Sequence, residues 1–179
     1  MSPEELLGFS LSSVLKVIGI AASPIAELRV AIPWAIWHDF PWYYAFVLAV
    51  IGNLLPVPFL LLFLEAISRW LSKIGFFNRF LQWLFEHTRR RGRIVERYER
   101  IGLVLFVAIP LPVTGAWTGS LLAVIFGLKF RYAFLSIFIG VCIAGIIVTC
   151  LSLLGWAGAA IAGIALCALA GYSLWRVSR

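Results

Sequence analysis

Two opposite charges lie two residues apart in an otherwise apolar stretch near the start of the chain. Glu27 and Arg29 occur between Pro24 and Pro33, in the run PIAELRVAIP. A charge near the centre of a bilayer costs about 3 kcal/mol on insertion scales, so it usually faces a cavity or a partner. The pair is therefore a candidate site for a polar substrate, a proton or an ion. The alternative is that the two charges neutralise each other, or cap half-helix ends, and only fix the local structure.

A second polar cluster, at residues 110–120, combines prolines, glycines and hydroxyl side chains. Its candidate site residues are Pro110, Pro112, Thr114, Trp117, Thr118 and Ser120. Helix N-termini in such a segment can present N–H groups and a positive dipole end to an anion. Alternatively, the hydroxyl groups simply bond to their own helix or to a neighbouring one. The tryptophan is either a wall of the cavity or an anchor at the membrane interface.

A third break interrupts a long apolar run with the sequence GNLLPVP, at residues 52–58. Proline removes a backbone donor and clashes with the preceding turn, so this run is expected to kink. Asn53 is either a cavity residue or the polar support of the kink. Lys16, in the first apolar stretch, either reaches the membrane surface or forms a salt bridge with Glu27.

Composition places these residues in a membrane protein. Of 179 residues, 63% are apolar and 13% are charged, and the mean hydropathy is +1.00. A soluble domain of this size could not present so much apolar surface to water. A spanning helix needs about 20 apolar residues, and the candidate stretches are 6–37, 43–72, 101–128, 130–154 and 156–175. They fill nearly the whole chain, which predicts a single membrane domain over residues 1–179.

Several functional classes find no support in the sequence. There is no Walker loop, no HExxH motif and no G-x-S-x-G motif, so we expect neither an enzyme nor a cofactor. His38 and His87 stand without partners at ligand spacing, which argues against a metal site. Cys142, Cys150 and Cys167 lie in apolar runs and are expected to pack as small apolar residues. The basic residues lie beside membrane segments, so nucleic acid is not expected as a partner.

The two halves of the chain resemble each other at an offset of 88 residues. The offset aligns, without a gap, Pro24 with Pro112, Ala35 with Ala123, Tyr44-Ala45-Phe46 with Tyr132-Ala133-Phe134, and Ile51-Gly52 with Ile139-Gly140. Each half then has an apolar stretch broken by proline, a short aromatic connector and a long apolar helix. This pattern predicts an internal duplication.

The positive-inside rule indicates how these segments cross the membrane. The 73–100 segment carries eight Lys and Arg against three Glu, and further basic residues are Lys129, Arg131, Arg176 and Arg179. Five crossings would place some of this positive charge outside in either orientation. If stretches 10–37 and 101–127 instead dip in and return, every strongly basic segment faces the cytoplasm. The sequence therefore predicts two re-entrant hairpins, three crossings, an outside N-terminus and a cytoplasmic C-terminus.

The predicted fold is an all-α integral membrane protein, an inverted repeat of a re-entrant helical hairpin plus a transmembrane helix. Repeat 1 covers about 10–72 and repeat 2 about 101–154, with an additional C-terminal transmembrane helix at 156–175. The basic linker 73–100 contains an amphipathic helix, at 75–88, that is expected to lie in the cytoplasmic interface. The last helix carries small residues at four-residue spacing, suited to packing within the monomer or in a homodimer: Gly155, Ala159, Gly163, Cys167 and Gly171.

Three of these motifs resemble those of the small multidrug export family. They are PIAELRVAIP at 24–33, GNLLPVP at 52–58 and PLPVTGAWTGS at 110–120, and the resemblance covers roughly residues 20–150. The paired hairpins also resemble those of the wider DedA (VTT) superfamily. Members of that superfamily are associated with proton-linked transport and with translocation of lipids such as undecaprenyl phosphate.

The resemblance assigns site residues by position. Glu27 and Arg29 match the charged first hairpin of the DedA superfamily, and Pro110 or Pro112 its proline-bearing second hairpin. A basic residue that is common in the second hairpin of DedA proteins is absent here, with residues 117 and 118 in its neighbourhood. The resemblance also implies a multi-pass protein of the prokaryotic inner (plasma) membrane.

Together these observations lead to a hypothesis of function. The chain would be a transporter or flippase that moves an amphipathic substrate, best an anionic lipid-linked headgroup of the polyprenyl phosphate type. Glu27 would take and release a proton, while Arg29 and residues 114–120 hold the headgroup and membrane lipid surrounds the protein. The first alternative is a proton-coupled exporter of small cationic drugs. The second is a membrane scaffold that transports nothing.

Overall fold

Helices make up the structure wherever the chain is described. The computed structural model describes residues 10–71, 92–110 and 114–155, together with a few positions between 157 and 164. Within these residues there is no strand, and the predicted all-helical class is confirmed. Two helical spans among the described residues are long and apolar enough to cross a bilayer: Trp42–Leu64, which joins two successive helices, and Phe130–Leu153. Their first residues agree closely with the predicted spans 43–72 and 130–154.

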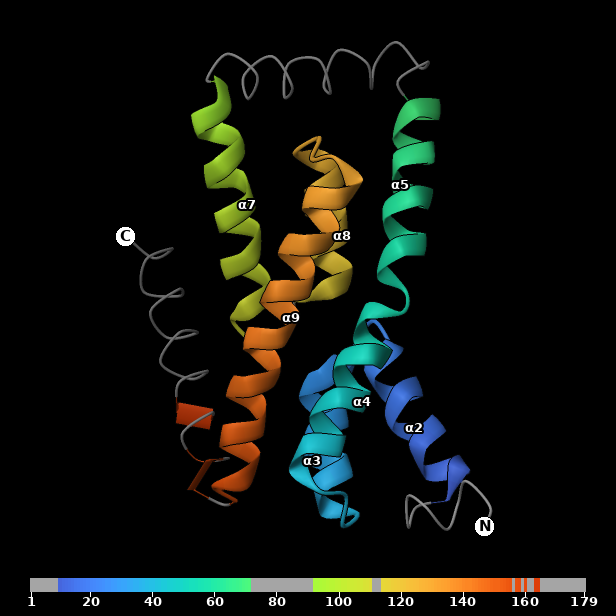
Figure 1. Ribbon diagram of the computed structural model, residues 1–179, viewed down its shortest axis with the longest axis vertical. Coiled ribbons are helices and arrows are strands. Elements are labelled where there is room, and N and C mark those ends of the chain that lie inside the picture. The colour runs from blue at the N-terminus through green and yellow to red at the C-terminus, as the bar shows by residue number, and fades with distance from the viewer. Residues whose placement is uncertain are drawn as a thin grey trace, which may run out of the picture.

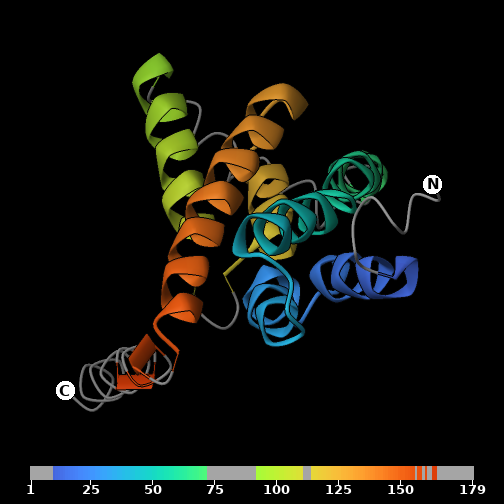
Figure 2. The same cartoon turned by 60° about the horizontal axis from the view of Figure 1, so that its bottom comes forward.

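The helices fall into two groups along the long axis of the molecule. In chain order they are α2 (Leu11–Ala22), α3 (Glu27–Trp37), α4 (Trp42–Leu54), α5 (Val57–Leu71), α7 (Gly92–Ala108), α8 (Ala116–Ile125) and α9 (Phe130–Leu153). Figure 1 shows α4 and α5 end to end, with α2 and α3 beside α4 in the lower half. In the upper half α7 and α8 pack against α9, and Figure 2 shows both groups from another side.

Two prolines explain the break between α4 and α5. Pro56 and Pro58 carry no N–H, so the carbonyls of Gly52 and Leu54 lose their intrahelical donors. Accordingly α4 ends at Leu54 and α5 begins at Val57. The interruption predicted at residues 52–58 is therefore present, and it lies where the lower and upper groups of helices meet (Figure 1).

The same helix-ending turn occurs twice, 88 residues apart. After α3 the left-handed residue is Asp39, with φ 64°, and after α8 it is Gly127, with φ 68°. In both turns the following amide donates to a carbonyl five residues back, as in a Schellman motif: Phe40 N to Ala35 O at 3.1 Å and Leu128 N to Ala123 O at 3.0 Å. The offset seen in the sequence thus also relates local backbone geometry.

Glycines let the long helices approach their neighbours closely. A Cβ atom on Gly52 of α4 would lie 2.6 Å from the carbonyl oxygen of Ile18 in α2. A Cβ atom on Gly140 of α9 would lie 2.7 Å from the Cβ of Val107 in α7. Gly52 and Gly140 are equivalent under the 88-residue offset. Each half therefore packs its long helix against the first helix of its own pair at the same position.

Replacement of the first of these glycines is expected to destabilise the protein. Gly52→Ala should cost about 1–3 kcal/mol, because the added methyl group meets backbone atoms that cannot move independently. Gly19→Ala in α2 is the matched control, since a Cβ there would have nothing within 4 Å. Thermal unfolding of the purified protein in detergent measures both variants. Equal melting temperatures for the two would contradict the close contact.

The outer surface of the described helices is strongly apolar. Large apolar side chains remain exposed, among them Ile25 at 92%, Trp37 at 85% and Phe59 at 71%. In water, contiguous apolar surface of this kind leads to aggregation or marks an interaction site. Lipid chains are the surroundings that suit such a surface, and a location in the membrane follows.

Part of the predicted linker 73–100 lies within the described residues. The first residue of α7 is Gly92, so residues 92–100 of the predicted linker already belong to a helix that continues to Ala108. No proline interrupts this segment, which explains the continuity. The predicted interfacial helix at 75–88 lies outside the described residues. So do most of the predicted C-terminal helix and the members Ala159, Cys167 and Gly171 of its small-residue stripe.

Candidate functional site

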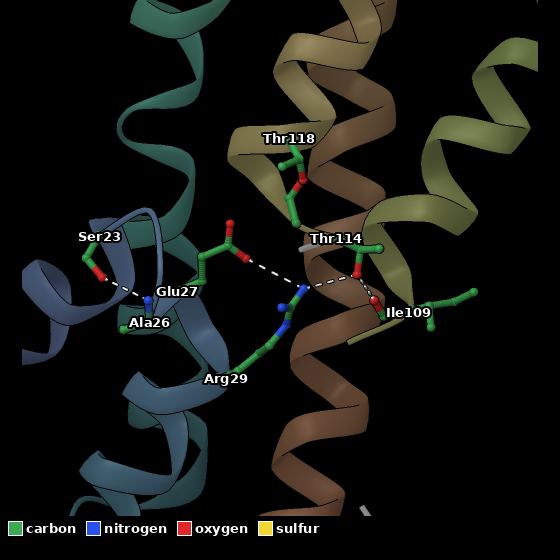
Figure 3. Close-up of polar contacts among 8 residues, drawn as sticks. Ser23, Ala26, Glu27, Arg29, Ile109, Thr114 and Thr118 are labelled. Atoms are coloured by element: carbon green, nitrogen blue, oxygen red, sulfur yellow. Dashed lines mark hydrogen bonds and ion pairs between the residues drawn. The ribbon is translucent and has the colours of Figure 1, made fainter. Parts of the chain in front are cut away.

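The turn between α2 and α3 holds Glu27 in an unusual conformation. Ser23 Oγ accepts a hydrogen bond from the backbone N–H of Ala26 at 3.1 Å, which shapes the turn (Figure 3). Glu27 follows with φ 50°, in the left-handed region. For a residue other than glycine this costs about 1–2 kcal/mol. Contacts made by its side chain must therefore help to hold it there.

The carboxylate of Glu27 caps a helix of the other half of the chain. Glu27 is only 5% exposed, and its carboxylate accepts hydrogen bonds from the backbone N–H groups of Ala116 and Trp117, the first residues of α8. The N-cap of α8 is Gly115, which has no side chain to satisfy these donors. A carboxylate at this position also interacts favourably with the positive end of the helix dipole. An acidic residue of the first helix pair thus replaces the missing cap in the second.

Gly115 makes room for this contact. A Cβ atom on Gly115 would overlap both carboxylate oxygens of Glu27. Its φ of 167° is extended backbone that any residue adopts, so the requirement for glycine is steric. The residue equivalent to Glu27 under the 88-residue offset is Gly115 itself. The first half of the chain therefore supplies the carboxylate at position 27. The second half supplies the space for it at the equivalent position, 115.

Arg29 forms a second link between the two turns. Its Nη2 lies 3.8 Å from Glu27 Oε2 and donates a hydrogen bond to Thr114 Oγ1 at 3.2 Å. Thr114 Oγ1 in turn donates to the carbonyl of Ile109, at the end of α7, at 2.6 Å. Figure 3 shows this chain of contacts from Glu27 through Arg29 to Thr114. The guanidinium of Arg29 thus contacts the carboxylate of Glu27, on its own helix, and the hydroxyl group of Thr114, which lies in the segment before α8.

Trp117 completes the connection in the opposite direction. Its indole Nε1–H donates to the carbonyl of Ala22, the last residue of α2, at 3.2 Å. A carbonyl at a helix C-terminus has no intrahelical donor, so this bond satisfies a group that would otherwise be unpaired. The turns 23–26 and 114–117 therefore interlock through contacts at Glu27, Arg29 and Trp117. We refer to these three residues with Thr114 as the polar cluster.

Other residues named from the sequence make different contacts. Ser120 is fully buried and donates to Ala116 O at 2.7 Å, within its own helix. Thr118 Oγ1 likewise donates to Gly115 O, at 3.4 Å. Pro110 follows the end of α7, whereas Pro112 is not among the described residues. Lys16 is exposed on α2, and the ion pair that the structure gives Glu27 is with Arg29.

Asn53 is buried near the crossing of α4 and α9. It is 1% exposed, and neither polar atom of its side chain has a hydrogen-bond partner among the described residues. Val50 lies one turn earlier on the same helix, and its side chain would contact a Cβ atom placed on Gly145 of α9. A buried amide without partners costs about 1–3 kcal/mol. Such a group is a candidate for binding a polar ligand, or for a partner in another conformation.

The sequence indicated the two charged residues of this candidate site and a helix N-terminus with N–H donors in the second cluster, but it did not indicate which residues provide these donors. The N–H groups of Ala116 and Trp117 and the space above Gly115 were not identified as parts of the site. A signal existed, because a helix that starts after glycine has no side-chain cap of its own. Within the described residues, no group of three or more His, Cys, Asp or Glu side chains could hold a metal ion.

Comparison with known proteins gives one match. The sequence model of a protein family described as "Putative small multi-drug export protein" matches residues 27–147, which begin at Glu27 and include Arg29 and the turn 114–117. No curated protein and no solved structure matches the chain.

Proposed function

We propose that this chain, which belongs to the family of small multi-drug export proteins, is a membrane transporter or flippase that moves an amphipathic substrate. The substrate class that fits best is an anionic lipid-linked headgroup of the polyprenyl phosphate type, and its binding is coupled to a proton that Glu27 takes up and releases. The observation that carries the proposal is the Glu27 carboxylate at the N-terminus of α8, beside Arg29.

The donors around Glu27 are those that a phosphate requires. Two backbone N–H groups of a helix N-terminus converge on the carboxylate, and the guanidinium of Arg29 lies 3.8 Å away. Helix N-termini and guanidinium groups are common phosphate ligands in proteins. Here an internal carboxylate holds them. A phosphate on a substrate can use the same donors only when Glu27 gives them up.

Protonation of Glu27 provides a way to release these donors. A neutral carboxyl group is a weaker acceptor than a carboxylate, and it no longer balances the charge of Arg29. The cluster would then carry a net positive charge and favour an anion. Binding of a proton and binding of an anionic headgroup are thus linked through one set of donors. This linkage is the physical basis for the proposed proton coupling.

The helix lengths support re-entrant hairpins in an inverted repeat. The helices α2, α3 and α8 contain 12, 11 and 10 residues. At about 1.5 Å per residue they are too short to cross a hydrocarbon core of about 30 Å. In Figure 1 α2 and α3 lie in the half of the molecule opposite to α7 and α8. This arrangement brings the two interlocking turns together near the middle, as in transporters with inverted repeats.

Thiol labelling tests the proposed topology in the prokaryotic inner membrane. With Cys142, Cys150 and Cys167 replaced by alanine, Trp37→Cys should react with a membrane-impermeant maleimide in intact cells, since residue 37 is 85% exposed and the proposed topology places it and Asp39 on the outer side. Lys129→Cys should react only after permeabilisation, because the basic segments are proposed to face the cytoplasm. Labelling of both cysteines from the same side would exclude the inverted arrangement.

Export of a small cationic drug is the second candidate. It is favoured by the family description and by the buried carboxylate of Glu27, which would attract a cation. To bind there, the cation would have to replace Arg29 and the two N–H donors of α8. A membrane scaffold is the alternative from another class. In a scaffold the same contacts would only fix the shape of the protein, and no substrate would be moved.

Glu27→Gln separates these functions. For the anionic substrate, cells with this variant should lose the protection that wild type gives against an antibiotic directed at the lipid carrier, while tolerance of a cationic dye stays unchanged. A cation exporter should show the reverse. Equal behaviour of variant and wild type under both agents would exclude Glu27 as the proton site. Absence of substrate-dependent flux by the wild-type protein in liposomes would favour the scaffold.

A further inference from the structure

An open apolar groove lies beside the polar cluster, between α5 and α8. Its volume is about 660 Å³. Its lining includes Leu55 and Pro56 at the break before α5, Phe59, Leu62 and Phe63 of α5, and Trp117 of α8. None of the described side chains that line it is charged.

The α4–α5 break places apolar side chains along this groove without covering them. Pro56, which helps to end α4, is itself part of the lining. The side chains of Phe59, Phe63 and Leu62 are 71%, 64% and 57% exposed, although α5 packs against α8. These side chains therefore form a surface that the described helices of this chain leave open.

Trp117 connects the groove to the polar cluster. Trp117 is one of the lining residues, while its Nε1–H donates to Ala22 O and its backbone N–H donates to the Glu27 carboxylate. Tryptophan suits such a boundary because it combines a large apolar body with a single polar edge. A molecule seated in the groove would therefore lie within one side chain of the donors proposed for the headgroup.

We propose that this groove binds the hydrocarbon chain of the substrate while the polar head occupies the cluster, an inference that rests on the proposed function. The occupant is a flexible hydrocarbon chain attached to an anionic group. A cationic aromatic drug fits less well, because the described lining residues include no acidic side chain and Glu27 is already paired with Arg29.

The contribution of the groove is to position the substrate. A chain that moves from the bilayer into an apolar groove leaves lipid rather than water, so the hydrophobic effect contributes little. Packing against Phe59, Phe63 and Trp117 instead selects where the chain lies and brings its head to the cluster. The groove also gives the substrate a sideways path from the bilayer, between α5 and α8.

Photolabelling of the full-length protein in lipid nanodiscs tests the proposal. The probes are dodecyl phosphate, dodecyltrimethylammonium and phosphatidylcholine, each with a diazirine on its hydrocarbon chain, and adducts are mapped by mass spectrometry. Dodecyl phosphate should label residues 55–63 severalfold more than residues 135–146 of α9, and unlabelled dodecyl phosphate should compete. Phe59→Ala should reduce this labelling severalfold. Leu135→Ala, an apolar residue on α9 that is 54% exposed, is the matched control and should not.

The other outcomes are equally informative. Equal labelling of the groove by phosphatidylcholine and dodecyl phosphate would reduce it to ordinary lipid contact and overturn the proposal. Stronger labelling by dodecyltrimethylammonium would overturn the anionic occupant.

Arg29→Gln, with Thr114→Val as a milder variant, tests the groove and the polar cluster separately. Loss of the phosphate preference in these variants supports both proposals together, whereas a preference that persists supports the groove and contradicts the headgroup site. If dodecyl phosphate does not label the groove but still stabilises wild type more than Arg29→Gln, the groove fails and the headgroup site stands.

Discussion

Arg29→Gln is expected to lower the free energy of unfolding by about 2–3 kcal/mol, and a second change, Glu27→Gln, is expected to return most of this loss. The single variant leaves a carboxylate, in a residue only 5% exposed, without its cationic neighbour. The range is set below that of fully buried pairs because the side chain of Arg29 is 20% exposed. The double variant has neither charge, so no buried charge remains uncompensated.

Thermal unfolding of the four proteins of this cycle measures the coupling between the two residues. Lys16→Gln is the matched control, because it removes a positive charge from an exposed position on α2 and should change the melting temperature little. The double variant should be folded but inactive in transport, since it lacks both the proton site and the guanidinium. Additive losses in the cycle would show that the two side chains do not interact.

Local features of the fold could be predicted because they depend on residues close in sequence. Prolines at 24, 56 and 58 lie at or near the interruptions that the structure contains. The apolar runs that start near 43 and 130 gave the two long helices, since hydropathy and length alone decide which segments can span a bilayer. The 88-residue offset aligned the positions of the two Schellman turns before their geometry was known.

The cap on α8 could not be predicted, because its donor and acceptor lie far apart in the sequence. The residue pattern predicted that the N-terminus of a half-helix can bind an anion, and it predicted that Glu27 needs a partner. It did not show that the Glu27 carboxylate is itself the anion at this helix N-terminus. That depends on how the two halves of the chain meet, which is decided by packing between them, such as Gly145 of α9 against Phe46 of α4.

The site is asymmetric, although an offset of 88 residues aligns the two halves of the chain. Position 27 of the first half corresponds to position 115 of the second, and these two residues touch each other in the structure. Two glutamates at these positions would place two carboxylates against each other without enough donors. A carboxylate facing a glycine avoids this repulsion and leaves one ionisable group at the meeting point. In the proposed mechanism, one proton on Glu27 would then change the charge of the cluster.

Gly115→Ala adds only one methyl group, but it is expected to reduce transport strongly. The methyl group would overlap the carboxylate oxygens of Glu27, so the carboxylate must leave the N-terminus of α8. Overpacking of this kind costs about 1–3 kcal/mol, and the displaced carboxylate can no longer exchange with a headgroup. Transport in liposomes and thermal unfolding measure the two effects. Gly102→Ala in α7, where a Cβ would have nothing within 4 Å, is the matched control and should be active.

A second substitution shows whether the carboxylate is the cause. Glu27→Ala removes the group that the new methyl would strike, so Gly115→Ala should add almost no further loss of stability in that background. Residues in contact commonly show coupling energies of about 0.5–3 kcal/mol. Transport should stay lost in the double variant, because the space is restored without the ionisable group. If Gly115→Ala destabilises the Glu27→Ala protein as much as it does the wild type, the contact between the two halves is not made through this carboxylate.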